Sequence, residues 1–198
     1  MYASERDEQV RQEWRTAMQQ QPGEDLVFVD ESSTHVAMTP LYARTLRGKR
    51  AYGAVPRNKG ANISLLAALT SSGMTAAMTV PGAVDGLVFE RYIEYVLIPE
   101  LSRGQTVVMD NLSVHKNARV AQLLHDHGCT LRFLPTYSPD LAPIEGGFGK
   151  VKTLVRRDQP RTRQELDQSI GRALAAVSPQ DAQGWFKRCG YLLPRQPL

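Results

Sequence analysis

Apolar residues along the chain follow two periods, one typical of strands and one typical of helices. Nearly continuous apolar runs at residues 26–30 and 105–110 predict strands that are buried on both faces of a sheet. Residues 62–69 and 74–80 are separated by a Ser-Ser-Gly turn, which predicts an antiparallel hairpin. Residues 130–134 predict one further short strand, so the chain supplies the strands of a mixed sheet.

Helical periods fill most of the remaining chain. Residues 1–23 predict a charged helix that ends at a Pro-Gly pair, with an apolar stripe formed by Val10, Trp14, Ala17 and Met18. Asp85 caps a helix whose broad apolar face includes Leu87. The other expected helices are residues 117–127, closed by Gly128, a helix begun by Pro143 with the stripe Ile144, Phe148, Val151 and Val155, and residues 163–176 and 179–188.

The order of these elements is typical of one fold class. A strand and a hairpin come first, followed by helix, strand, helix, strand and helix. This order predicts an α/β, ribonuclease H-like mixed sheet of three antiparallel and then two parallel strands, flanked by helices. We expect an N-terminal helix or linker at residues 1–23, a catalytic core at residues 24–160, and C-terminal helices packed on that core at residues 161–198.

Composition narrows the class of protein. The chain has 198 residues, of which 42% are hydrophobic and 22% charged, as expected for one folded globular domain. No apolar run is long enough to cross a bilayer, and the polar start predicts no secretory signal. The two cysteines, Cys129 and Cys189, cannot form a disulfide framework or a four-thiolate zinc site, so we expect reduced thiols.

Positive charge is unevenly distributed. The formal net charge is +4, and no acidic residue occurs between Ser32 and Val84. That interval contains the basic residues Arg44, Arg47, Lys49, Arg50, Arg57 and Lys59. Such a cluster favours a polyanionic partner, because arginine forks match phosphate groups well. A solvated basic face is the alternative.

Three acidic residues are placed where they could form one site. Asp30 ends the first strand, Asp110 ends the fourth, and Glu145 lies in the first turn of the helix after the fifth. If the first and fourth strands are neighbours, three carboxylates meet, and their repulsion calls for a cation such as Mg²⁺. Two such ions would support phosphoryl transfer. Individually, the aspartates could be turn formers, and Glu145 could complement the helix dipole.

The helix that carries Glu145 has cations on the same face. Gly149, Lys152 and Arg156 follow Glu145 at helical spacing, beside the apolar stripe. A polyanion lying along this face could place a phosphate at Glu145. An ordinary solvated helix face is the alternative.

Three sequence blocks carry a family resemblance. Residues 26–32 (LVFVDES), 107–116 (VVMDNLSVHK) and 134–145 (LPTYSPDLAPIE) closely resemble motifs of DDE transposases of the insertion-sequence 630 and mariner superfamily. Asp110 and Glu145 are separated by 34 residues, positions 111–144, which is the spacing of that superfamily.

The resemblance implies a specific activity. Asp30, Asp110 and Glu145 would bind two Mg²⁺ or Mn²⁺ ions and form the catalytic site of a metal-dependent DNA endonuclease and strand transferase. Water would cleave DNA at the transposon ends, and the freed 3′-hydroxyl would attack target DNA at a TA dinucleotide. The partners implied are DNA, further copies of the chain, and helix-turn-helix modules encoded separately, in a bacterial cytoplasm close to the nucleoid and not at a membrane.

Some positions depart from the family or stand beside its motifs. Ala142 replaces the usual Asn, and Gly146 and Gly147 directly follow Glu145, which predicts a loosely held glutamate. Asn111 and His115 could orient a metal-bound water, or form structural hydrogen bonds. Two other functions remain open: an inactive remnant that binds DNA or a partner, and a different ribonuclease H-like nuclease that cuts hybrids or junctions.

Overall fold

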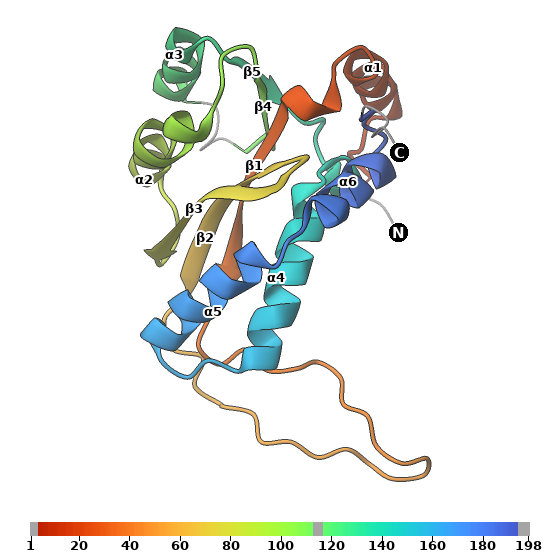
Figure 1. Ribbon diagram of the computed structural model, residues 1–198, viewed down its shortest axis with the longest axis vertical. Helices are drawn as coiled ribbons and strands as arrows, with labels where there is room; N and C mark the ends of the chain where they lie inside the picture. The colour runs from red at the N-terminus through yellow and green to blue at the C-terminus, as the bar shows by residue number, and fades with distance from the viewer. Residues whose placement is uncertain (1–3, 113–116, 194–198) are drawn as a thin grey trace.

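The predicted sheet is confirmed. The computed structural model describes residues 4–112 and 117–193. Its strands are β1 (Leu26–Thr34), β2 (Ile63–Thr70), β3 (Gly73–Pro81), β4 (Thr106–Met109) and β5 (Thr130–Phe133), in the spatial order β3-β2-β1-β4-β5. The first three strands pair antiparallel, and β1, β4 and β5 pair in parallel. This is the ribonuclease H-like arrangement expected from the order of elements (Figure 1).

Strand β1 is longer than its apolar run predicts. The expected strand ends at Asp30, whereas β1 continues to Thr34 because its polar end pairs with β2. Thr34 is buried there, and its hydroxyl donates a hydrogen bond to the carbonyl of Ile63 over 3.0 Å. Asp30 therefore lies inside β1, at the point where pairing with the shorter β4 stops.

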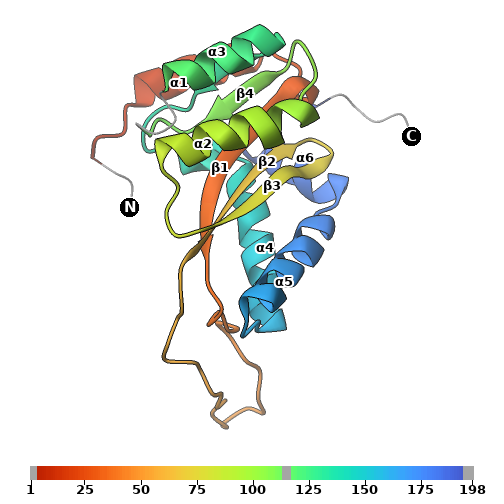
Figure 2. The ribbon, with the colours of Figure 1, turned by 90° about the vertical axis from the view of Figure 1, so that its left-hand side faces the viewer.

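One face of the sheet is covered by α2 (Gly86–Tyr92) and α3 (Ala118–His127) (Figures 1 and 2). α2 continues through a π-helical turn, Ile93–Leu97, and a short 3-10 turn, Ile98–Glu100. The predicted caps are confirmed, since Asp85 accepts a hydrogen bond from the Val88 amide and Gly128 closes α3 at a φ of 86°. Leu87 was expected on the apolar face, but it points outward and is 64% exposed.

The other face is covered by four helices. They are α1 (Glu8–Met18), α4 (Ile144–Asp158), α5 (Arg163–Ala175) and α6 (Pro179–Arg188). All four members of the predicted α4 stripe are buried in the core that these helices form with β1 and β2. Both faces of β1 and β2 are therefore covered, which explains why their sequences are apolar without alternation.

The expected stripe of α1 is wrong at two of its four positions. Val10 and Ala17 are exposed, whereas Trp14 and Met18 pack against the core. The second buried side chain of this helix is instead Arg11, which is charged. A periodicity of apolar residues could not reveal this, because the buried position is held by an ion pair.

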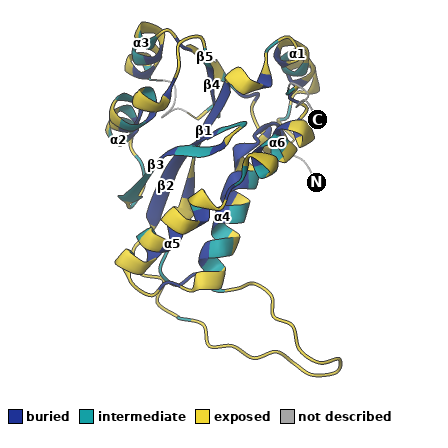
Figure 3. Ribbon diagram, viewed as in Figure 1, coloured by how far each residue is buried: buried dark blue, intermediate teal, exposed yellow. Residues whose placement is uncertain are grey.

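The basic segment forms a long excursion between β1 and β2. Residues 35–62 contain no helix or strand, and residues 40–61, here called the arm, extend away from the sheet (Figure 1). Nearly the whole arm is exposed (Figure 3). Its base is tied to the junction of α4 and α5, because the guanidinium of Arg161 donates to the carbonyls of Val36 and Met38, over 3.2 Å in each case.

Two further sequence-based expectations concern the described residues. Cys129 and Cys189 are both free thiols, and both are buried. Among the helices of residues 4–112 and 117–193, none is long and apolar enough to span a membrane.

Candidate active site

Two aspartates emerge side by side where parallel pairing ends. Val29 of β1 pairs with Met109, the last residue of β4, and adjacent strands are about 4.8 Å apart. The next residues, Asp30 within β1 and Asp110 just after β4, therefore emerge next to each other. The Asp30 carboxylate accepts a hydrogen bond from the amide of Glu31 at 2.7 Å, and that of Asp110 accepts from the amide of Leu112 at 3.1 Å. These bonds restrict the orientation of both carboxylates. Glu31 itself is exposed, as expected for the next residue of a strand.

Glu145 reaches the same place from a helix. It is the second residue of α4, and its amide donates to the carbonyl of Ala142 at 3.2 Å. The buried side chains of Ile144 and Phe148 fix the face of α4 that meets the sheet, which leaves Glu145 exposed beside the core. A carboxylate in the first turn also interacts favourably with the helix dipole.

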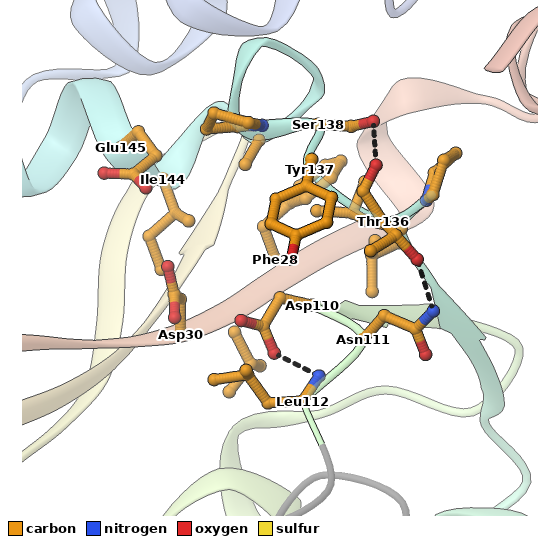
Figure 4. A pocket seen from close by; sticks show the side chains of 16 residues that line it. Phe28, Asp30, Asp110, Asn111, Leu112, Thr136, Tyr137, Ser138, Ile144 and Glu145 are labelled. Carbon is orange, nitrogen blue, oxygen red and sulfur yellow. Dashed lines mark hydrogen bonds between the residues drawn. The ribbon is translucent and has the colours of Figure 1, made fainter. Parts of the chain in front are cut away.

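All three carboxylates line one cavity of about 290 Å³ (Figure 4). Its apolar wall is formed by Phe28, Val29, Val108, Leu134 and Ile144. The polar part of its wall includes Asn111, Thr136 and Tyr137. The sheet order thus brings together residues that are 115 positions apart in the sequence (30 and 145).

The three carboxylates do not form a closed ligand cluster. Among residues 4–112 and 117–193, no group of three or more His, Cys, Asp or Glu residues is gathered closely enough to hold a metal ion. Figure 4 shows Asp30 and Asp110 on the strand side of the cavity and Glu145 on the helix side. The donor chemistry nevertheless fits a hard divalent ion, because every acidic group lining the cavity offers carboxylate oxygens.

Asn111, His115 and Ala142 were the other positions that the sequence singled out in or beside the motifs. Asn111 lines the cavity, and its side-chain amide donates to the hydroxyl of Thr136 at 3.1 Å, which joins the ends of β4 and β5. His115 lies outside the described residues. Ala142 is buried, and its backbone amide donates to the carbonyl of Pro139 at 3.0 Å within the turn before α4.

The glycine pair after Glu145 has a packing role. A Cβ atom on Gly146 would lie 2.6 Å from the indole ring of Trp185, and one on Gly147 would lie 2.7 Å from the sulfur of Met74. Real Cβ atoms do not approach so closely, so a side chain at Gly146 would displace the indole of Trp185 on α6, and one at Gly147 would require the flexible side chain of Met74 on β3 to shift. The ring of Trp185 covers the start of α4 at Gly146. The glycine pair therefore lies in a packed turn of the helix, while the side chain of Glu145 itself is exposed.

The cations of α4 and the arm come together only in part. Lys152 and Arg156 are half-buried on α4. Burial, together with the positive charges of Lys59 and Arg156, holds the pKa of His35 below its ordinary value, which places both cations close to the base of the arm. Arg44, Arg47, Lys49, Arg50 and Arg57 are exposed further along the arm.

Sequence patterns missed three residues around the site. Tyr137 lines the cavity and is 55% exposed, with a positive φ of 54° that is rare for a bulky side chain. Arg15 of α1 and Arg188 of α6 line a second cavity of about 480 Å³, which shares Glu145 with the first. Tyr137 stands in a recognisable motif, but no local signal could place Arg15 of α1 and Arg188 of α6 beside Glu145.

Comparison with known proteins agrees with the fold and shows the family. The family model "DDE superfamily endonuclease" matches residues 25–167. No curated protein matches the chain in sequence. The fold resembles that of Mos1 transposase in a paired-end complex with the left transposon end, with a TM-score of 0.72 and 14% identity over 92% of this chain.

The same likeness holds for the isolated catalytic domain of Mos1. With Raltegravir and Mn, that domain gives a TM-score of 0.70 and 15% identity, and the match covers 96% of this chain and 92% of the domain. The match covers only 56% of the Mos1 chain in the paired-end complex. Because the family model spans most of the chain and all three carboxylates, the chain belongs to the DDE superfamily endonucleases.

Proposed function

We propose that this chain is the catalytic domain of an insertion-sequence 630 or mariner-type transposase. It would cleave DNA at the ends of a transposable element and join the freed 3′-hydroxyl to target DNA at a TA dinucleotide. The observation that carries the proposal is the adjacency of Asp30 and Asp110 at the end of parallel pairing, with Glu145 lining the same cavity. The sequence motifs and the membership of the DDE superfamily support it.

In this proposal Asp30, Asp110 and Glu145 hold two divalent ions, Mg²⁺ or Mn²⁺. When bound, the ions would activate the attacking oxygen and stabilise the leaving oxygen of the phosphodiester. Glu145 is exposed and can change its side-chain rotamer, so it can turn toward the two aspartates without movement of α4. Solved structures of the Mos1 catalytic domain with Mn and with Mg support this choice of ion.

The residues around the carboxylates would orient the reacting groups. The amides of Glu31 and Leu112 hold Asp30 and Asp110, and the bond from Asn111 to Thr136 holds the cavity wall. The apolar wall excludes water from one side of the site. Cleavage and joining would proceed by direct attack on phosphorus, with no intermediate in which DNA is covalently bound to the protein.

The cations of α4 and the arm indicate a path for DNA. α4 carries Glu145 in its first turn and runs to the base of the arm (Figure 1). Lys152 and Arg156 follow Glu145 along this helix, and Arg156 and Lys59 both lie near His35 at the base of the arm, so these cations would lead away from the cavity. Phosphate groups following these cations would pass from Glu145 to the arm. The paired-end complex of Mos1 transposase supports the further proposal that this chain acts as a homo-oligomer on paired DNA ends.

The test is metal-dependent nicking of supercoiled plasmid DNA that carries the element's ends. Asp110→Asn should bind DNA as tightly as the wild type and lose nicking by at least about 10³-fold, because a carboxylate ligand becomes a neutral amide. Glu31→Gln is the matched control, since Glu31 is exposed and absent from the cavity wall. Wild-type nicking rates in Asp110→Asn would contradict the proposal.

The two other functions are separated by the same assay. The glycine pair does not favour an inactive remnant, because Trp185 and Met74 occupy the space beside it. Replacing the plasmid with a DNA junction or an RNA–DNA hybrid tests the remaining nuclease activities. Faster cleavage of either than of duplex ends would replace the transposase proposal.

A further inference from the structure

The most deeply buried charge in the described residues belongs to α1. Arg11 has no exposed side-chain surface, although α1 is otherwise a polar helix. Its guanidinium donates two hydrogen bonds to the carboxylate of Asp140, at 3.1 and 2.6 Å, and a longer one to Glu8 at 3.4 Å. Burying a guanidinium is costly unless its donors are matched, and this two-pronged geometry is the strongest way to match them.

The partner of Arg11 lies just before the helix that carries Glu145. Asp140 belongs to the 3-10 turn Pro139–Leu141, and α4 begins three residues after that turn ends. Pro143 stands at the N-cap of α4 and provides no side-chain cap. The start of α4 is therefore not fixed by its own cap, and other contacts must fix it.

A second contact holds the backbone of the same turn, and α1 contributes to it through Trp14. The hydroxyl of Tyr191 donates to the carbonyl of Leu141 at 2.6 Å, and the indole N–H of Trp14 donates to that hydroxyl at 3.3 Å. Burial raises the pKa of Tyr191 well above its ordinary value, so the donor proton is retained. The hydrogen bond from Arg11 lowers the pKa of Asp140, so its carboxylate stays charged.

We propose that Arg11 is a positioning residue for the active site. Through Asp140 it fixes the turn that begins α4, and thereby sets the place of Glu145 relative to Asp30 and Asp110. This inference rests on the proposed function. The family model begins at residue 25 and ends at residue 167, so both Arg11 and Tyr191 lie outside the part of the chain that it matches. α1 would thus belong to the catalytic unit although it lies outside the part of the chain that the family model matches.

The expected effect follows from the need for alignment. A displacement of about 1 Å in a catalytic group can cost about 10²-fold in rate, whereas it leaves distant DNA contacts intact. Arg11→Met removes the charge and keeps the length of the side chain. Its kcat for plasmid nicking should fall by about 10- to 100-fold, with the KM for DNA changed by less than about twofold. Its affinity for Mn²⁺, measured by calorimetry, should fall as well.

Three further variants separate positioning from folding. Arg11→Lys keeps the charge without the fork and should recover part of the lost kcat. Arg172→Met is the matched control, because Arg172 lies on α5 and pairs with Asp158 at the C-terminal end of α4, away from the cavity. Its kcat should equal that of the wild type. If Arg11→Met does not fold, Asp140→Asn tests the same bond with almost no change in shape.

The results distinguish a failure of this inference from a failure of the proposed function. Wild-type kcat and Mn²⁺ affinity in a folded Arg11→Met or Asp140→Asn variant would overturn the inference and leave the proposed function standing. A lower kcat that Arg11→Lys does not improve at all, with unchanged Mn²⁺ affinity, would also overturn it. A wild-type protein that neither binds Mn²⁺ nor nicks DNA would overturn the proposed function itself.

Discussion

At the scale of single residues, the glycines of α4 differ in the space that surrounds them. Helix propensity alone marks Gly146 as a weak point beside Glu145. In the structure it is the residue that lets the indole of Trp185 reach α4. Gly149, one turn later on the same helix, has nothing within 4 Å of the position that a Cβ atom would occupy. The two glycines should therefore respond in opposite ways to the same substitution.

We expect Gly146→Ala to destabilise the protein by about 1–3 kcal/mol, because the added methyl group overpacks the contact with Trp185. Gly149→Ala should stabilise it by about 1 kcal/mol, because alanine loses less backbone entropy in a helix. Urea denaturation of both variants measures the difference. Equal stabilisation in both would show that Trp185 does not pack on α4 as described.

At the scale of elements, strands with unbroken apolar runs and helices with clear stripes could be predicted, because burial imposes their periods. The polar end of β1 could not be predicted in this way, because it is held by pairing with β2 rather than by burial of apolar side chains. The buried face of α1 could not either, because Arg11 is buried through its bond to Asp140. Both exceptions depend on partners that are distant in the sequence.

The arm is the element whose role is most open to test. Within the described part of the chain, no acidic side chain forms an ion pair with its six cations, so their charge is available to phosphate. Reversing two charges, as in Lys49→Glu with Arg50→Glu, should weaken DNA binding. It should also reduce the slope of log affinity against log salt by about 2, because each lost phosphate contact removes about 0.9.

Arg132→Glu is the control for this experiment. Arg132 lies on β5, the edge strand beyond β4, whereas the arm connects β1 and β2. Fluorescence anisotropy with a duplex oligonucleotide at several salt concentrations gives both slopes. An unchanged slope in the arm variant would exclude phosphate contacts at these two positions.

At the scale of the whole molecule, topology assembles the site. The positions of the two aspartates relative to the sheet could be predicted once β1 and β4 were taken as neighbours, and their register confirms it. The second cavity, between α1 and α6, could not be predicted, because it depends on how these two helices pack beside Glu145. The motifs identify the three carboxylates, and the packing of helices that are distant in sequence shapes the site around them.

The central claim is that Asp30, Asp110 and Glu145 converge on divalent ions. A crystal of this protein grown with Mn²⁺, measured for anomalous scattering, tests it directly. We predict anomalous peaks in the cavity at coordinating distance, about 2.1 Å for an ion of the size of Mg²⁺, from oxygens of all three carboxylates. A cavity without such a peak at saturating Mn²⁺, or a peak that Glu145 does not contact, would contradict the account.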